Sequence, residues 1–235
     1  MTKTIHYCWF GGAPLPDEYI KSWQKYLPDY KIKRWDESNF DINCCDYVRE
    51  AYAAKKWAFV SDYARIKIIY ENGGIYFDTD VELIKPPADI VNGAFMGLER
   101  NHKNVGINLG LGFGAPAGTE ILKELLQYYN SIHFDSRVTV VTHVSGIFKR
   151  YGFNFKDELQ TVAGVTLYPS EYLSPIDSAT HKMTVTPKTV SIHHFAASWQ
   201  SGGDKYKTKI KKLLGPTLTR FLIAVKQLFK KENDN

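Results

Sequence analysis

Two aspartates, Asp78 and Asp80, have the residue types and the spacing that most directly indicate chemistry in this sequence. They follow Ile75–Phe77, a short apolar run that favours a β-strand. Open α/β folds bind ligands at the carboxyl ends of their strands. In an extended chain the two carboxylates would lie roughly 7 Å apart, so one can bind a hard divalent cation while the other acts through water or binds a sugar hydroxyl. We therefore predict a site for a metal ion and a diphosphate.

A helix should precede this strand and end beside it. Apolar residues recur with a helical period between residues 46 and 70. Asn72–Gly74 then supplies residues that tolerate a positive φ, which ends the helix. We predict two helices in this segment, with a break near residues 58–61 and with Ser61 as the N-cap of the second.

A charged pair lies at the start of the second helix. Asp62 and Arg65 are one i,i+3 step apart, so they share a helix face. We expect this face to point toward the loop that carries Asp78 and Asp80. The plainer alternative is an ion pair on the protein surface.

The rest of the chain reads as one α/β domain in which strands and helices alternate. We predict strands over residues 3–10, 30–35, 75–77, 81–85, 94–99, 138–141, 165–168 and 189–195, and further helices over residues 16–27 and 119–129. The glycine-rich run at residues 108–118 does not have the spacing of a dinucleotide-binding fingerprint. Alternating glycines in a strand instead indicate tight backbone packing or a ligand that approaches closely.

Both ends of this domain carry residues suited to a binding site. Trp9 ends the first strand before Gly11–Gly12, so its indole either stacks on a base or packs in the core. His193 and His194 lie in the last strand. A histidine pair there is commonly structural, but beside a proposed metal site either ring is a candidate ligand.

Composition and charge exclude several classes of protein. Three cysteines, Cys8, Cys44 and Cys45, form no disulfide framework, and we expect a reducing compartment. The N-terminus has no apolar signal segment, and no stretch approaches 18 apolar residues, so secretion and a membrane span are not expected. The net charge is +5, yet residues 204–235 alone contain nine Lys/Arg and three Asp/Glu. The basic character belongs to this tail, and nucleic-acid binding is not indicated.

The tail forms a second region of the chain. We predict a catalytic domain over residues 1–203 and a basic amphipathic helical tail over residues 204–235. Apolar stripes flanked by lysines over residues 205–231 suit an anionic membrane surface. Packing on the domain and contact with a second subunit are the alternatives.

Taken in order, these motifs resemble a known family. The run Ser61-Asp62-x-x-Arg65, followed by Asn72-Gly73-Gly74-Ile75-Tyr76-x-Asp78-x-Asp80, is similar to the sugar-binding region with a DXD motif in glycosyltransferase family 32. This family includes bacterial capsule enzymes and yeast mannosyltransferases, and it is similar to the catalytic domains of clostridial glucosylating toxins. The resemblance spans roughly residues 3–200 and includes the segments around Trp9 and His193–Trp199.

The resemblance implies a GT-A type fold, a Rossmann-like α/β/α sandwich, and an enzyme that retains anomeric configuration. It implies Mn²⁺ or Mg²⁺ as cofactor and a nucleotide-sugar donor, which we expect to be a UDP-hexose. The implied catalytic residues are Asp62, Arg65, Asp78 and Asp80. The metal ligands would be Asp78, Asp80 and His194, with His193 as the next choice. Donor contacts would come from Trp9, Gly11, Ser61, Asp62, Arg65, Gly74, Asp78, Asn108, Ser198 and Trp199.

The function expected from the sequence is hexose transfer from a nucleotide sugar to a glycan acceptor in surface polysaccharide biosynthesis. The tail suggests a lipid-linked acceptor and a peripheral location at the cytoplasmic face of the cell membrane. Two alternatives are a toxin-like glycosyltransferase that modifies a protein and a nucleotide-sugar-binding protein without catalysis. The four charged residues of the DXD region argue against the last alternative.

Overall fold

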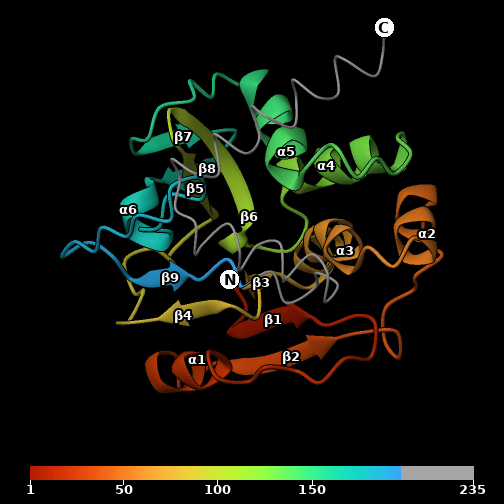
Figure 1. Cartoon of the computed structure of the whole chain (residues 1–235), viewed down its shortest axis with the longest axis horizontal. Helices are drawn as coiled ribbons and strands as arrows, with labels where there is room; N and C mark the ends of the chain where they lie inside the picture. Colours follow the sequence, from red (N-terminus) through yellow and green to blue (C-terminus); the bar gives the residue numbers. More distant parts are fainter. Residues whose placement is uncertain (197–235) are drawn as a thin grey trace, which may run out of the picture. The chain divides into compact units, whose positions relative to one another are not determined.

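A central sheet of seven strands organises the structure, a computed structural model that describes residues 1–196 (Figure 1). Its strands are β1 (Thr4–Cys8), β2 (Lys31–Trp35), β3 (Gly74–Tyr76), β5 (Phe95–Asn101), β6 (Asn104–Ala115), β7 (Gln160–Val162) and β8 (Val165–Tyr168). Their spatial order is β2-β1-β3-β6-β5-β8-β7. Two further strands, β4 (Val81–Leu83) and β9 (Ser191–His193), form a separate antiparallel ribbon.

The direction of the strands changes at β3. Strands β2, β1 and β3 are parallel, whereas β6 pairs antiparallel with β3. Strand β5 is antiparallel to β6 and parallel to β8. The loop after β3 therefore leaves the sheet beside the carboxyl end of β1 and next to a strand of opposite direction, in the kind of crevice where α/β sheets bind ligands.

Each face of the sheet is covered, which gives the chain two hydrophobic cores. The helices are α1 (Ile20–Tyr26), α2 (Asp46–Ala53), α3 (Trp57–Asn72), α4 (Glu120–Asn130), α5 (Val140–Lys149) and α6 (Ser170–Leu173). Apolar side chains from α2, α3, α4 and α5 build one core, while α1, α6 and the β4–β9 ribbon contribute to the other. The α/β/α sandwich expected from the resemblance is confirmed.

One expected strand is a helix. Residues 138–141 were expected to be extended because Val138, Val140 and Val141 favour strands. In the structure Val140 instead begins α5, whose buried residues include Val144, Ile147 and Phe148. Their spacing from Val140 is that of an amphipathic helix. The apolar face that packs against the sheet therefore outweighs the local β preference.

The helices before β3 also differ from expectation. The break between α2 and α3 falls at residues 54–56, where Lys55 has a φ of 56°, and not at residues 58–61. Ser61 consequently lies inside α3, where its hydroxyl donates to the carbonyl of Trp57, and it does not cap the helix. The predicted end of α3 is confirmed, since Gly73 has a φ of 65° and its N–H donates to the Ile69 carbonyl at 2.8 Å.

The predicted tail, residues 204–235, lies outside the described residues, as does the predicted domain boundary at residue 203. Its amphipathic character remains a prediction from the sequence. Among residues 1–196, no helix combines the length and the apolar character needed to cross a bilayer.

Candidate active site

The two aspartates of the DXD motif lie in a tight turn between β3 and β4. The N–H of Asp78 donates to the Gly110 carbonyl at 3.2 Å, and the N–H of Val81 donates back to the Asp78 carbonyl at 3.0 Å. Because the backbone turns here, Asp78 and Asp80 come closer than the extended spacing predicted. One carboxylate oxygen of each lies within 4.8 Å of the other and of a nitrogen of His193.

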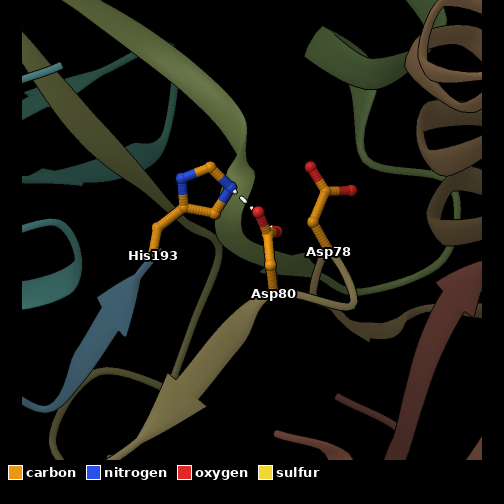
Figure 2. Close-up of side chains that lie close together, drawn as sticks. All are labelled: Asp78, Asp80 and His193. Carbon is orange, nitrogen blue, oxygen red and sulfur yellow. Dashed lines mark ion pairs between the residues drawn. The ribbon is translucent and has the colours of Figure 1, made fainter. Parts of the chain in front are cut away.

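His193 joins this group through the β4–β9 ribbon, which pairs Val81 with His193. Figure 2 shows the His193 ring directed toward Asp80, with Asp78 on the other side of Asp80. Its Nε2 lies 3.1 Å from Oδ1 of Asp80, and both side chains are largely buried. Burial lowers the pKa of the imidazole, but the carboxylates of Asp80, Asp78 and Glu99 together outweigh this, so the pKa of His193 is raised. Nδ1 is buried and has no hydrogen-bond partner among residues 1–196. Nε2 is thus the nitrogen that faces the carboxylates.

These three side chains fit a divalent cation. They offer two carboxylate oxygens and one imidazole nitrogen that all lie within 4.8 Å of one another. Carboxylates suit Mg²⁺ and Mn²⁺, and imidazole is a common additional ligand for first-row metals. Asp78, Asp80 and His193 are therefore a candidate metal-binding group.

The neighbouring His194 has different contacts. Its ring stacks on Tyr19 with centroids 4.4 Å apart, and its Nε2 lies 2.9 Å from Oε2 of Glu82. Only its backbone approaches the site, through an N–H that donates to the Asp80 carbonyl. The sequence favoured His194 over His193 as a ligand, whereas the structure brings His193 into the group and His194 to Glu82.

Arg65 lies between two carboxylates on the other side of Asp78. Its Nη2 is 3.2 Å from Asp62 and 3.3 Å from Asp78, and its Nε donates to the Ser61 carbonyl. The arginine and Asp62 side chains are buried. The i,i+3 pair thus faces the aspartate loop, as expected, and it is no surface ion pair. The guanidinium also lies over the Tyr76 ring, whose hydroxyl donates to Asp78 at 2.9 Å.

The balance of charge explains the titration of this cluster. Burial raises the pKa of Asp62 to about 7 although Arg65 opposes the shift, and the Asp78 charge adds to the increase. Burial also raises the pKa of Asp78. One guanidinium is shared between the buried carboxylate of Asp62 and the partly exposed carboxylate of Asp78, so Asp62 holds its proton to a higher pH than an ordinary aspartate.

The third side of the site comes from β6 and β5 and was only partly anticipated. The register of β5 and β6 shifts between Met96 and Gly97, which leaves a bulge that contains Gly110. A Cβ on Gly110 would lie 2.3 Å from Oδ2 of Asp78, 3.1 Å from Oδ1 of Asn108 and 3.2 Å from Nη1 of Arg65. Only glycine fits there, and its absent side chain lets these groups gather.

Asn108 was predicted as a sugar contact, and its amide lies within this group. Its Nδ2 donates to Oε2 of Glu99, and its Oδ1 accepts from the N–H of Gly110. The Glu99 charge also raises the pKa of His193. Sequence reasoning missed Glu99 because the site contact depends on the register of two strands, and an isolated glutamate in a strand gives no signal.

The remaining predicted donor contacts lie in three places. Trp9 and Gly11 lie just beyond the carboxyl end of β1, and two residues lie outside the described part of the chain. Gly74 begins β3 beside Thr4, at the amino end of β1, so the structure does not bring it to the DXD turn. Trp9 is partly exposed, and its indole N–H donates to the Ala13 carbonyl at 2.6 Å. Gly11 has a φ of 88°, and a Cβ there would clash with the Trp57 ring. Gly74 has a φ of 102°, and a Cβ would lie 2.6 Å from the Thr4 carbonyl oxygen. Ser198 and Trp199 lie outside the described residues.

Comparison with known sequences supports the resemblance over part of the chain. Residues 16–96 match the profile of the family described as "Glycosyltransferase sugar-binding region containing DXD motif". The segment contains α3, β3 and the DXD turn, which are the elements that carry the resemblance. Among curated proteins, no sequence matches the chain significantly.

Several solved glycosyltransferase structures are similar to this chain. The "PaToxG Glycosyltransferase" is 16% identical with a TM-score of 0.49, over 63% of this chain and 69% of the other. A glycosyltransferase "involved in the glycosylation of the major capsid of PBCV-1" is 13% identical with a TM-score of 0.47, over 87% and 98%. A structure of the galactosyltransferase LgtC with donor and acceptor sugar analogues is 13% identical with a TM-score of 0.37, over 87% and 94%.

Proposed function

We propose that this protein, whose residues 16–96 match the glycosyltransferase sugar-binding region with a DXD motif, is a metal-dependent enzyme that moves a hexose from a nucleotide sugar to a glycan acceptor. One observation carries the proposal. Ligand atoms of Asp78, Asp80 and His193 all lie within 4.8 Å of one another, and Asp78 also contacts the buried Arg65. The two aspartates and Arg65 belong to the matched region. A metal-diphosphate site needs both a set of anionic ligands and a nearby cation.

The proposed cofactor is Mn²⁺ or Mg²⁺, held by Asp78, Asp80 and His193. When bound, the ion would neutralise negative charge on the donor diphosphate and so favour its departure. We further propose a UDP-linked hexose as the donor. The partly exposed Trp9 at the end of β1 supports a stacked base in this region.

Arg65 would act on the leaving group. Its guanidinium contacts Asp62, Asp78 and the Ser61 carbonyl, and these three contacts fix the plane of the group. Its Nη1 lies 3.2 Å from the point where a Cβ of Gly110 would stand, beside the carboxylate of Asp78. A hydrogen-bond donor held in this position stabilises negative charge as it develops on the diphosphate, and it need not reorganise during the reaction.

The proposed chemistry breaks the bond between the anomeric carbon and the diphosphate oxygen, and forms a bond from that carbon to an acceptor hydroxyl oxygen. The hydroxyl proton passes to the departing phosphate oxygen. We propose attack from the same face as departure, so that the product retains the anomeric configuration. Proton NMR of the product at early times tests this stereochemistry, and an inverted anomer would contradict it.

We propose a lipid-linked glycan as the acceptor and the inner face of the cell membrane as the location, because residues 205–231 are basic and amphipathic in sequence. Flotation with anionic liposomes tests this part. The full chain should float, and a chain that ends at Gly203 should not. Equal flotation of both would contradict membrane association through the tail.

Donor hydrolysis tests the catalytic part of the proposal. The full chain is incubated with a panel of nucleotide sugars, with Mn²⁺ or with a chelator, and release of nucleoside diphosphate is measured. We expect Mn²⁺-dependent release from one class of donor, and its loss in Asp80→Ala. The matched control is Asp89→Ala, which removes an exposed carboxylate outside the site. Full activity of Asp80→Ala in the presence of the chelator would contradict the mechanism.

A further inference from the structure

Glu99 and Asn108 form a fixed polar pair beside the metal-binding group. Strand pairing places Gly97 opposite Asn108 and Glu99 opposite Gly106, so Glu99 is the diagonal neighbour of Asn108. At such a distance a long side chain can reach across the strands. The contact is made, since Nδ2 of Asn108 donates to Oε2 of Glu99.

The orientation of the Asn108 amide is determined by its two partners. The Gly110 N–H donates at 2.7 Å, so the atom that faces it must be the amide oxygen. The amide nitrogen then faces Glu99, which accepts one of its two N–H groups. Asn108 is buried, and it is held from both sides in one rotamer.

The pair has one further hydrogen-bond donor and one further hydrogen-bond acceptor to offer a ligand. The second N–H of Asn108 and the Oε1 atom of Glu99 have no hydrogen-bond partner among residues 1–196. A hydroxyl group both donates and accepts, so a pair of adjacent hydroxyls on a sugar ring complements this arrangement. A carboxylate acceptor also gives a stronger hydrogen bond than a neutral group.

The position of the pair points to the donor sugar. Oδ1 of Asn108, Oδ2 of Asp78 and Nη1 of Arg65 all lie within 3.2 Å of the point where a Cβ of Gly110 would stand. Asn108 therefore shares its space with the groups proposed to hold the diphosphate. The transferred hexose is bonded directly to that diphosphate, so it must lie within reach of the same groups.

We propose that Glu99, together with Asn108, binds hydroxyl groups of the donor hexose and determines which hexose the enzyme accepts. This inference rests on the proposed function and adds the residue that sets its sugar specificity. A site built to hydrogen-bond a hydroxyl rejects a substrate that lacks it or presents it in the wrong orientation, because the buried polar groups are then left unpaired.

Glu99→Gln is a suitable variant because it can keep the contact with Asn108. The amide oxygen of Gln can accept from Asn108, and its NH₂ group then replaces the free carboxylate oxygen. The variant thus turns an acceptor for the sugar into a donor with almost no change in size. The matched control is Glu120→Gln, the same chemical change at the exposed first residue of α4.

Calorimetry in Mn²⁺ compares UDP, UDP-glucose, UDP-galactose, GDP and GDP-mannose as ligands of the full-length wild type and both variants. We expect Glu99→Gln to bind the free nucleotide within about twofold of the wild type, and to bind the matching nucleotide sugar about 10- to 100-fold more weakly. Discrimination between the epimers should fall as well. Glu120→Gln should behave as the wild type.

A second measurement uses the wild type and does not depend on the folding of a variant. The ligands are nucleotide sugars in which one hydroxyl of the hexose at a time is replaced by fluorine, which cannot donate a hydrogen bond. We expect fluorine to weaken binding to the wild type at the position whose hydroxyl donates to Glu99. The same replacement should weaken binding to Glu99→Gln by less, because the hydroxyl and the carboxylate contribute through one shared hydrogen bond.

The outcomes separate the two proposals. If Glu99→Gln binds free nucleotide and nucleotide sugar as the wild type does, with unchanged epimer preference, the role of Glu99 is overturned and the glycosyltransferase proposal stands. If the wild type binds none of the five ligands in Mn²⁺, the proposed function fails, and the role of Glu99 fails with it.

Discussion

The site has two sides that meet at Asp78 and differ in how they are built. The arginine side, Asp62 and Arg65, belongs to a single helix and is almost completely buried. The ribbon side, Asp80 and His193, comes from chain segments more than 100 residues apart and is held by a two-stranded ribbon. The arginine side contains its own counter-charge, whereas the ribbon side gathers ligands that a cation would complete. The first is therefore part of the stability of the fold, and the second serves mainly to bind.

Replacing Arg65 should have the largest effect, because it breaks the arginine side. Arg65→Met leaves the buried Asp62 without its partner, and removal of one member of a buried ion pair costs about 3–5 kcal/mol of unfolding free energy. Turnover should be lost as well. Urea unfolding and donor hydrolysis measure the two effects. Asp80→Ala provides the contrast, with lost turnover and a stability close to that of the wild type; equal destabilisation by both variants would contradict the comparison.

The arginine side should also make stability depend on pH. Asp62 holds its proton up to about pH 7 in the folded protein, whereas an ordinary aspartate releases it near 3.8. Between these two pH values the folded state therefore binds more protons than the unfolded state. The stability that Asp62 contributes is present below about pH 4 and is lost as pH rises toward 7. The unfolding free energy should fall by at most about 1.4 kcal/mol per pH unit over this range.

Unfolding of the metal-free protein by urea at several pH values measures this dependence. In Asp62→Asn the contribution is absent, so the difference in stability between wild type and variant should change steadily between pH 4 and pH 7 in the direction that favours the variant. A difference that stays constant over this range would show that the Arg65 charge keeps Asp62 ionised throughout.

The two histidines test the ribbon side. His193→Ala should weaken Mn²⁺ binding by more than about 100-fold, since even residues that only support a ligand contribute 10- to 100-fold. His194→Ala should change it by less than about threefold, because that ring lies against Tyr19 and Glu82. Paramagnetic titration with Mn²⁺ measures both. The reverse order of effects would return the ligand role to His194.

The smallest expected effect is at the point where the two sides meet. Tyr76→Phe removes the hydroxyl that donates to Asp78 at 2.9 Å but keeps the ring beneath Arg65. One hydrogen bond to a charged group contributes about 1.5–3 kcal/mol of free energy at most. Because Asp78 is partly exposed, water can replace the lost hydroxyl and restore part of this contribution. We expect donor hydrolysis to fall by about tenfold or less with unchanged metal affinity. A loss as large as that in Arg65→Met would contradict this ranking.

The same division explains what the sequence could predict. Asp62, Arg65, Asp78 and Asp80 are linked by local structure, namely an i,i+3 step, a glycine stop and a short strand, so their convergence follows from periodicity and turn residues. The choice between His193 and His194 depends on the register of β9 against β4, which decides which ring faces Asp80. A shift of one residue reverses that choice, and no local pattern in the sequence specifies it.

Glu99 could not be predicted for a related reason. Its contact with Asn108 requires the pairing of β5 with β6 and the bulge that contains Gly110. The helix at Val140–Lys149 was different, because the signal was present in the sequence. Buried residues at Val140, Val144 and Ile147 follow a helical period, whereas the local run of β-branched residues favours a strand.

The β4–β9 ribbon has a consequence for how the protein is made. Val81 pairs with His193, so the metal-binding group is closed by a strand that leaves the ribosome 112 residues after its partner. The arginine side can form once β6, which contains Gly110, has been synthesised, but the ion cannot be bound by three ligands until synthesis has passed residue 193. Nascent chains, and chains that terminate before residue 193, therefore lack one of the three candidate ligands. Contacts between such distant segments form late and slowly, so binding of the proposed cation should report that synthesis has passed residue 193.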